Sequence, residues 1–118
     1  MPHLVLEYSA NILQEVDWRG LFARLHQAVA ESGAPLAGCK SRAVRHETYC
    51  VADGAPAGAF LHLSIALLSG RSDEAKAALT ARCLQLLADE YRPSLATLDL
   101  QISVELRDLH RESYQKAS

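Results

Sequence analysis

The sequence lacks the features that mark membrane, secreted and nucleic-acid-binding proteins. Its longest apolar run, residues 59–68, is interrupted by His62 and Ser64 and is far shorter than the roughly 18 residues that span a bilayer. The first residues contain no basic region followed by an apolar run, so we expect no signal peptide. The net charge of −2 provides no basic field for phosphates, so we expect neither a membrane nor a nucleic acid as partner.

The sequence also has few of the residues that bind metals or form disulfides. Its three cysteines are widely spaced without a Cys-x-x-Cys pair, and its five histidines include no pair at the four-residue helical spacing. This pattern argues against a metal site or a thiol redox motif. The odd number of cysteines favours a reduced, cytoplasmic location.

The residues that are present indicate one globular domain, residues 1–118, because 49 % are hydrophobic and 22 % are charged. The order strand, helix, strand occurs twice. The pattern predicts strands at 3–8, 39–51, 60–68 and 98–107, a helix that begins after Asp17, a helix that runs from Ser72 to just before Pro93, and a polar tail, 110–118, that is an arm or disordered. We interpret this as an internal duplication, with pseudo-repeats at about 2–58 and 59–109.

The predicted fold class is α+β. Two β-α-β units with right-handed crossovers form a four-stranded sheet with two helices on one face. The other face of such a sheet is bare, and apolar residues on it would need cover. We therefore expect an oligomer in which the sheets face inward.

Pro2 is the first candidate for chemistry. If Met1 is removed, Pro2 carries a free secondary amine at the start of a strand. An N-terminal amine titrates near ~8, and burial or neighbouring cations lower that pKa. Such an amine can act as a general base at cellular pH. The alternative is that Met-Pro is only a common start without a function.

Arg71 is the second candidate. Gly70 gives the tight turn from the strand at 60–68 into the next helix, and Arg71 follows at the start of that helix. A cation gains nothing from the positive end of its own helix, whereas backbone N–H groups at that end favour an anion. This placement favours a carboxylate-binding site, because the guanidinium binds carboxylates bidentately. The alternative is a solvated surface arginine.

Lys40 and Arg42 form a cationic pair. They are two residues apart in a segment that we expect to be extended, so both side chains point to one face. They are candidates for substrate binding. The alternative is an exposed basic strand edge that discourages aggregation.

Two strings of residues resemble a known family. Residues 69–76 (Ser-Gly-Arg-Ser-Asp-Glu-Ala-Lys) resemble the strand-to-helix turn of the 4-oxalocrotonate tautomerase family, and residues 35–40 (Pro-Leu-Ala-Gly-Cys-Lys) resemble that family's entry to its second strand. The duplicated form, with Met-Pro-His at the start, is similar to the 5-carboxymethyl-2-hydroxymuconate isomerases. The resemblance extends from Pro2 to about Leu109.

The resemblance implies a cofactor-free tautomerase with Pro2 as general base and Arg71 as a catalytic cation. The family carries an arginine at the position of Lys40, so either Lys40 or the neighbouring Arg42 would bind the substrate. The implied partners are a small dicarboxylate or tricarboxylate and two further copies of the chain in a homotrimer. Two alternatives stay open. One is another Pro2-dependent enzyme, a hydratase or a dehalogenase, and the other is a non-catalytic binding protein with the same fold.

Overall fold

The computed structural model describes all 118 residues. Its element order contains both predicted β-α-β units. The elements are β1 (His3–Ser9), α1 (Trp18–Glu31), the 3-10 helix η1 (Leu36–Gly38), β2 (Lys40–His46), β3 (Gly58–Leu68), α2 (Asp73–Glu90), α3 (Arg92–Thr97), β4 (Asp99–Leu109) and the 3-10 helix η2 (Arg111–Ser113).

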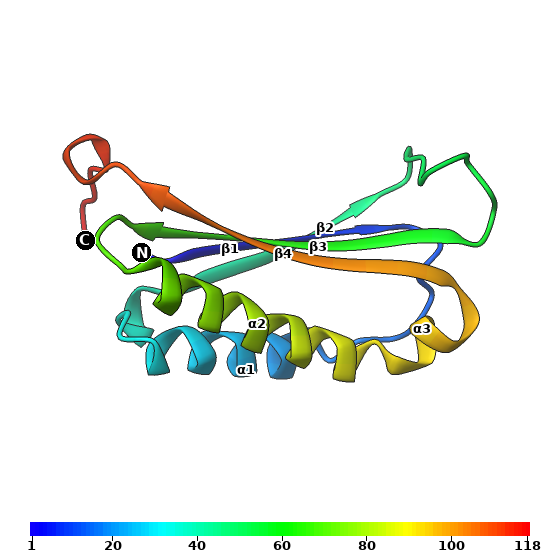
Figure 1. Cartoon of the computed structure of the whole chain (residues 1–118), viewed down its shortest axis with the longest axis horizontal. Coiled ribbons are helices and arrows are strands. Elements are labelled where there is room, and N and C mark those ends of the chain that lie inside the picture. Colours follow the sequence, from blue (N-terminus) through cyan, green and yellow to red (C-terminus); the bar gives the residue numbers. More distant parts are fainter.

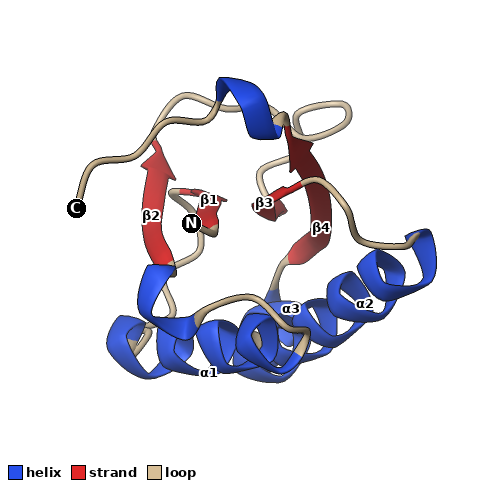
Figure 2. Cartoon of the chain, turned by 90° about the vertical axis from the view of Figure 1, so that its left-hand side faces the viewer, coloured by secondary structure: helices blue, strands red, loops and turns tan.

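The four strands form one sheet in the order β2-β1-β3-β4. Each β-α-β unit contributes a parallel pair, β1 with β2 and β3 with β4, and β1 and β3 join the units in antiparallel pairing. Both long helices cover the same face of the sheet (Figure 1). Figure 2 shows the C-terminal chain crossing near the opposite face, from the β4 side toward the β2 side. The predicted fold class is therefore confirmed.

The helices begin where the sequence predicts. The Asp17 side chain accepts a hydrogen bond from the Gly20 N–H at 3.2 Å, and the Ser72 hydroxyl accepts one from the Ala75 N–H at 3.1 Å. These caps satisfy backbone donors that have no partner within the helix. Gly33 follows α1 with a φ of +106°, a left-handed conformation that glycine adopts at low cost.

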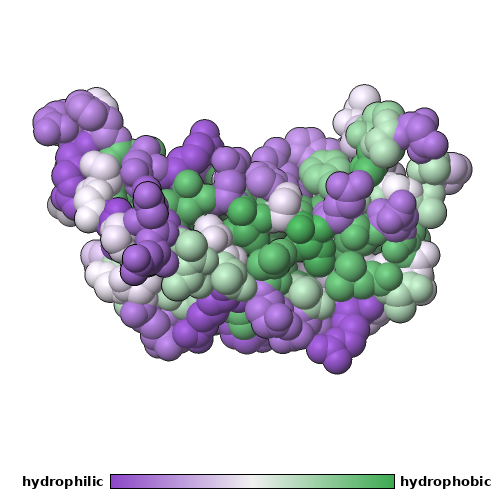
Figure 3. Space-filling model, viewed as in Figure 1, coloured by the Kyte–Doolittle hydropathy of each residue, from purple (hydrophilic) through white to green (hydrophobic).

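The core lies between the helices and one face of the sheet. Alternate residues of β3 point toward the helices and are at most 2 % exposed: Ala59, Leu61, Leu63, Ile65 and Leu67. Leu21 and Leu25 of α1 pack against this face and are fully buried. In Figure 3 hydrophobic side chains lie in the middle of the molecule, and the end that carries the C-terminal chain is hydrophilic.

The opposite face of the sheet is mixed: it carries apolar side chains such as Val44 and Phe60 beside two pairs of histidine and glutamate. His46 Nε2 lies 2.9 Å from Glu7 Oε1, and His62 Nε2 lies 2.9 Å from Glu105 Oε1. The alternation of side chains in β1, β3 and β4 places these groups on this face. It also means that β3 is fully buried on one face only.

The segment predicted as a strand at 39–51 is shorter in the structure. β2 ends at His46, whose register partner is Ser9, the last residue of β1. Beyond His46, β2 has no strand beside it, so residues 47–57 form a loop. The Tyr49 ring instead packs edge-on against Phe60, with ring centroids 6.3 Å apart.

Two further differences concern α3 and the tail. The first helix of the second unit ends before Pro93 as predicted, but α3 then begins with Pro93 in its first turn, where the missing N–H of proline leaves no bond unmade. Residues 110–118, predicted as an arm or disordered, form an ordered arm that contains η2. No helix of the chain is long and apolar enough to cross a membrane.

Candidate functional site

The candidate site lies at the end of the sheet where β1 and β2 begin and where β3 and β4 end. Register pairs His3 with both Lys40 and Ala66, and pairs Leu68 with Leu109. We call this region the Pro2 end and define it as residues 1–3, 36–42, 67–71 and 109–116. Figure 1 shows both termini there. It therefore collects residues from both β-α-β units.

Pro2 is fully buried at the start of β1, and its carbonyl accepts a hydrogen bond from the Lys40 N–H at 3.0 Å. The Met1 amine donates to the Gly38 carbonyl at 2.8 Å. A Cβ on Gly38 would lie only 2.6 Å from the Met1 carbonyl oxygen. The absence of a side chain at Gly38 thus allows the first residue to lie directly on η1.

Lys40 and Arg42 both lie next to this terminus. Lys40 Nζ donates to the Gly38 carbonyl at 3.1 Å. Arg42 Nη1 donates to His3 Nδ1 at 3.3 Å. The guanidinium of Arg42 has no carboxylate within salt-bridge distance, and neither has the ammonium of Lys40.

Arg71 enters the Pro2 end from the turn after β3. Gly70 has a φ of +127°, which allows the chain to leave the strand and start α2. The Arg71 Nη1 donates to the Leu68 carbonyl at 3.3 Å, and no acidic side chain pairs with it. The antiparallel register of β1 and β3, continued by one residue, sets Pro2 opposite Leu67, next to this turn.

Sequence reasoning missed Arg111 and Tyr114. Arg111 Nε donates to the Ser69 carbonyl at 2.7 Å, and the Tyr114 hydroxyl lies 3.1 Å from His3 Nε2. The parallel pairing of β3 and β4 is the signal that could have found Arg111. The carboxyl ends of parallel strands meet at one edge, so Arg71 and Arg111, each just beyond its strand, meet there too.

Charge is distributed unevenly over the chain. Five of its twelve lysine and arginine side chains pair with carboxylates, namely Arg24, Arg45, Lys76, Arg82 and Arg92. Of the seven that have no acidic partner, five belong to the Pro2 end, and these are Lys40, Arg42, Arg71, Arg111 and Lys116. Cations that gather without acidic partners favour the binding of an anion.

These cations change the titration of their neighbours. Burial, together with the hydrogen bond and charge of Lys40 and the charge of Lys116, lowers the pKa of the Met1 amine. Burial and the charges of Arg42, the amine and Lys40 lower the pKa of His3. His3 is therefore neutral at pH 7, and an amine at this position loses its proton more readily than an ordinary one.

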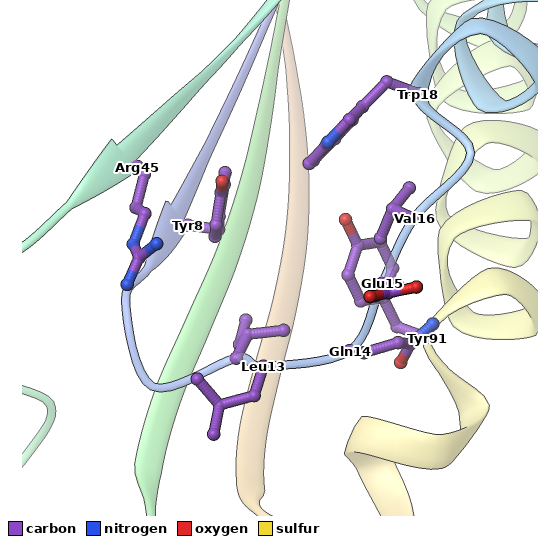
Figure 4. Close-up of a pocket in the computed structure, with 9 residues that line it drawn as sticks. Tyr8, Leu13, Gln14, Glu15, Val16, Trp18, Arg45 and Tyr91 are labelled. Atoms are coloured by element: carbon purple, nitrogen blue, oxygen red, sulfur yellow. The ribbon is translucent and has the colours of Figure 1, made fainter.

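A hollow of about 390 Å³ lies at the other end of β1, where Tyr8, Leu13, Trp18, Arg45 and Tyr91 are among its lining residues (Figure 4). Its arginine already pairs with Glu47 at 3.0 Å. This hollow and four others in the chain are lined by none of the residues Pro2, Lys40, Arg42 and Arg71. The Pro2 end is thus separate from the hollow at the other end of β1.

The arrangement at the Pro2 end can bind a small anion that has more than one carboxylate. The guanidinium groups of Arg42, Arg71 and Arg111 provide planar donor pairs, and Lys40 and Lys116 provide compact charges. An N-terminal amine with a lowered pKa lies among them. No three histidine, cysteine, aspartate or glutamate side chains gather anywhere in the chain to hold a metal ion.

Solved structures of other proteins share this fold over almost the whole chain. The structure of a fused 4-OT, a symmetric trimer, matches with a TM-score of 0.74 and 24 % identity, over 98 % of this chain and 91 % of that chain. A 5-carboxymethyl-2-hydroxymuconate isomerase from Deinococcus radiodurans R1 matches with a TM-score of 0.89 and 29 % identity, over 98 % of this chain and 88 % of that chain.

Sequence comparison identifies the family. The model of the 5-carboxymethyl-2-hydroxymuconate isomerase family matches residues 2–118. The 5-carboxymethyl-2-hydroxymuconate Delta-isomerase of Escherichia coli is 33 % identical over 111 residues, which cover 93 % of this chain and 88 % of that protein. The chain therefore belongs to the 5-carboxymethyl-2-hydroxymuconate isomerase family, and the resemblance noted in its sequence is confirmed.

Proposed function

We propose that this protein is an isomerase that converts a 2-hydroxymuconate-type dienol, 5-carboxymethyl-2-hydroxymuconate, into its conjugated ketone in the breakdown of aromatic compounds. The observation that carries the proposal is the group of five cations without acidic partners around the start of β1. The name of this substrate describes three carboxylates, two in muconate and one in the carboxymethyl group. A cationic site of this kind suits such an anion.

In the proposed mechanism Pro2 is the general base after Met1 has been removed. Its nitrogen takes the proton of the 2-hydroxyl group, and the electron pair of that O–H bond forms the ketone. The conjugated double bonds shift by one position, and the protonated amine returns the proton to the far carbon of the diene. Atoms and charge balance, because the reaction only moves one proton and two double bonds.

The cations have two roles in this mechanism. Arg71 and either Lys40 or Arg42 bind carboxylates and stabilise the negative charge that develops on the substrate oxygen. The same charges disfavour the protonated amine. The lowered pKa of the Met1 amine, one residue before Pro2, supports this effect. A base with a pKa close to the working pH is the most effective.

We further propose that the protein works in the cytoplasm as a homotrimer. None of five hollows in the single chain is lined by Pro2, and this supports an oligomer in which a neighbouring subunit helps to enclose the substrate. The fused 4-OT with the same fold is a symmetric trimer. Each chain contains two fused units, so three chains would provide the same six units as a hexamer of single-unit chains.

The proposal is tested with Pro2→Ala, which keeps a small residue at position 2. We expect the kcat/KM for 5-carboxymethyl-2-hydroxymuconate, followed by ultraviolet absorption, to fall by about 10²-fold, because the rigid secondary amine of the ring is replaced by a freely rotating primary amine. Pro56→Ala in the exposed loop is the control and keeps wild-type activity. Unchanged activity in Pro2→Ala would remove Pro2 from the mechanism.

Two measurements separate the alternatives. The intact mass of the purified protein reports whether Met1 has been removed, and a retained methionine favours the non-catalytic binding protein. Product identification distinguishes an isomerase, whose product has the mass of its substrate, from a hydratase, whose product has gained water, or a dehalogenase, whose product has lost halide.

A further inference from the structure

The C-terminal arm, residues 110–118, lies against the Pro2 end through contacts of Arg111 and Tyr114. Arg111 Nε donates to the Ser69 carbonyl at 2.7 Å. The Tyr114 ring meets the His3 ring edge-on, with centroids 6.2 Å apart. Lys116 lies near enough to the Met1 amine to lower its pKa. These contacts join the end of the chain to its beginning.

His3 links the arm to the candidate substrate-binding residues. Arginine can only donate hydrogen bonds, so His3 Nδ1 accepts the hydrogen bond from Arg42 Nη1 at 3.3 Å. The neutral imidazole then carries its proton on Nε2, which donates to the Tyr114 hydroxyl oxygen at 3.1 Å. These two hydrogen bonds, from Arg42 to His3 and from His3 to Tyr114, fix the arm. We call this set of three residues the latch.

Arg111 is the residue that the latch brings into position. Its Nη2 lies 3.4 Å from where a Cβ on Gly70 would be, which places the guanidinium in van der Waals contact with the turn that carries Arg71. Nε is used by the Ser69 carbonyl. The two Nη groups have no carboxylate partner, and the side chain is exposed. They can bind a ligand carboxylate.

We propose that Arg111 is a specificity-determining residue that binds the third carboxylate of a tricarboxylate substrate, and that the latch positions it. The inference rests on the proposed function and deepens it. The other cations of the site serve the two carboxylates of the muconate chain. Arg111 then favours a substrate with a carboxymethyl group over the corresponding dicarboxylate.

The test measures Arg111→Gln with 5-carboxymethyl-2-hydroxymuconate and with 2-hydroxymuconate. We expect the KM for the tricarboxylate to rise roughly 10-fold, as for the loss of one charge-assisted hydrogen bond. We expect the kcat for both substrates, and the KM for the dicarboxylate, to change by less than about 2-fold. Arg92→Gln, in α3 and paired with Asp89 at 2.9 Å, is the control and changes neither. An equal rise in KM for both substrates would overturn the proposal.

The latch is tested with Tyr114→Phe, which removes the acceptor for His3 and keeps the ring. We expect the KM for the tricarboxylate to rise by a smaller factor than in Arg111→Gln. The double variant should match Arg111→Gln alone, because the two residues act as one unit. Multiplied effects in the double variant would contradict the latch as the device that positions Arg111.

A binding measurement separates failure of this inference from failure of the proposed function. The probe is propane-1,2,3-tricarboxylate, compared with glutarate in calorimetric titrations of the wild-type trimer or monomer as purified. We expect Arg111→Gln to weaken binding of the tricarboxylate roughly 10-fold and that of glutarate much less. If the wild-type protein prefers glutarate, or binds both equally well, Arg111 does not select the third carboxylate, whatever reaction Pro2 performs.

Discussion

At the scale of single residues, the Pro2 end differs from the rest of the surface in the partners of its cations. Arg82 in α2, for example, pairs with Glu31 at 2.8 Å, as an ordinary exposed arginine does. Lys40 instead lies beside the N-terminal amine and lowers its pKa through a hydrogen bond and through charge. It also occupies the position at which the family resemblance gives arginine. A lysine there provides charge without bidentate geometry.

This environment predicts how the pH dependence of activity responds to Lys40→Ala. The base must be neutral to accept a proton, so kcat/KM rises with pH through the pKa of the Pro2 amine. Removal of the neighbouring positive charge raises that pKa, because the protonated form is less disfavoured, and Lys40 lowers the pKa of the Met1 amine in this way. We expect the rise in the kcat/KM profile to move to higher pH.

Arg19→Ala is the control for this shift, because Arg19 is exposed on α1 in the helix layer. Its profile should overlay that of the wild type. A profile of Lys40→Ala that stays in place while KM rises would mean that Lys40 binds substrate without influencing the base.

At the scale of helices and strands, local signals predicted most of the structure. Asp17 and Ser72 cap the helices as expected, because a cap depends only on residues within the first turn. The end of β2 could not be predicted in this way, since it is fixed by the length of β1 beside it. Pro93 was expected only to end a helix, yet it also lies in the first turn of the next helix, α3.

The buried face of α1 predicts a difference between two leucines. Leu25 is fully buried, whereas Leu13, in the segment before the helix, is 82 % exposed. We expect Leu25→Ala to lower the free energy of unfolding by about 2–5 kcal/mol, because it removes apolar contacts and leaves a cavity. Leu13→Ala should change it by less than about 0.5 kcal/mol. Urea unfolding at one protein concentration measures both, and equal effects would contradict this description of the core.

At the scale of the whole molecule, sequence reasoning named Pro2, Lys40, Arg42 and Arg71 as candidates, left open whether residues 110–118 form an arm, and missed the contacts of that arm with the site. Each of the four lies within a recognisable local motif. Tyr114 and its partner His3 are 111 positions apart, so no local pattern relates them. A polar tail has the same composition whether it is solvated or docked, and only the paired ends of β3 and β4 direct it to the site.

The proposed trimer makes a prediction for two hydrophobic side chains of equal exposure. Val44, on the outer strand β2, and Leu84, on α2, are each 40 % exposed. Val44→Glu adds a charge at the edge and mixed face of the sheet, where neighbouring subunits would meet. We expect it to convert a species of three times the 12.9 kDa chain mass into monomers, with light scattering as the measurement.

Leu84 lies in the outer helix layer, so Leu84→Glu should leave the trimer intact. If it dissociates the protein as well as Val44→Glu does, the subunits associate through their helices. If neither variant alters a trimer, the edge of β2 is not part of the interface.

The separation of charge described above also affects how fast a ligand arrives. The chain has a net charge of −2, yet five of its seven unpaired cations gather at one end. An approaching polyanion is therefore repelled by most of the surface and attracted toward the Pro2 end, which raises the rate constant for productive encounters. Mobile ions screen such fields over a Debye length of about 8 Å at physiological ionic strength. We therefore expect the association rate for a polyanion to fall as ionic strength rises.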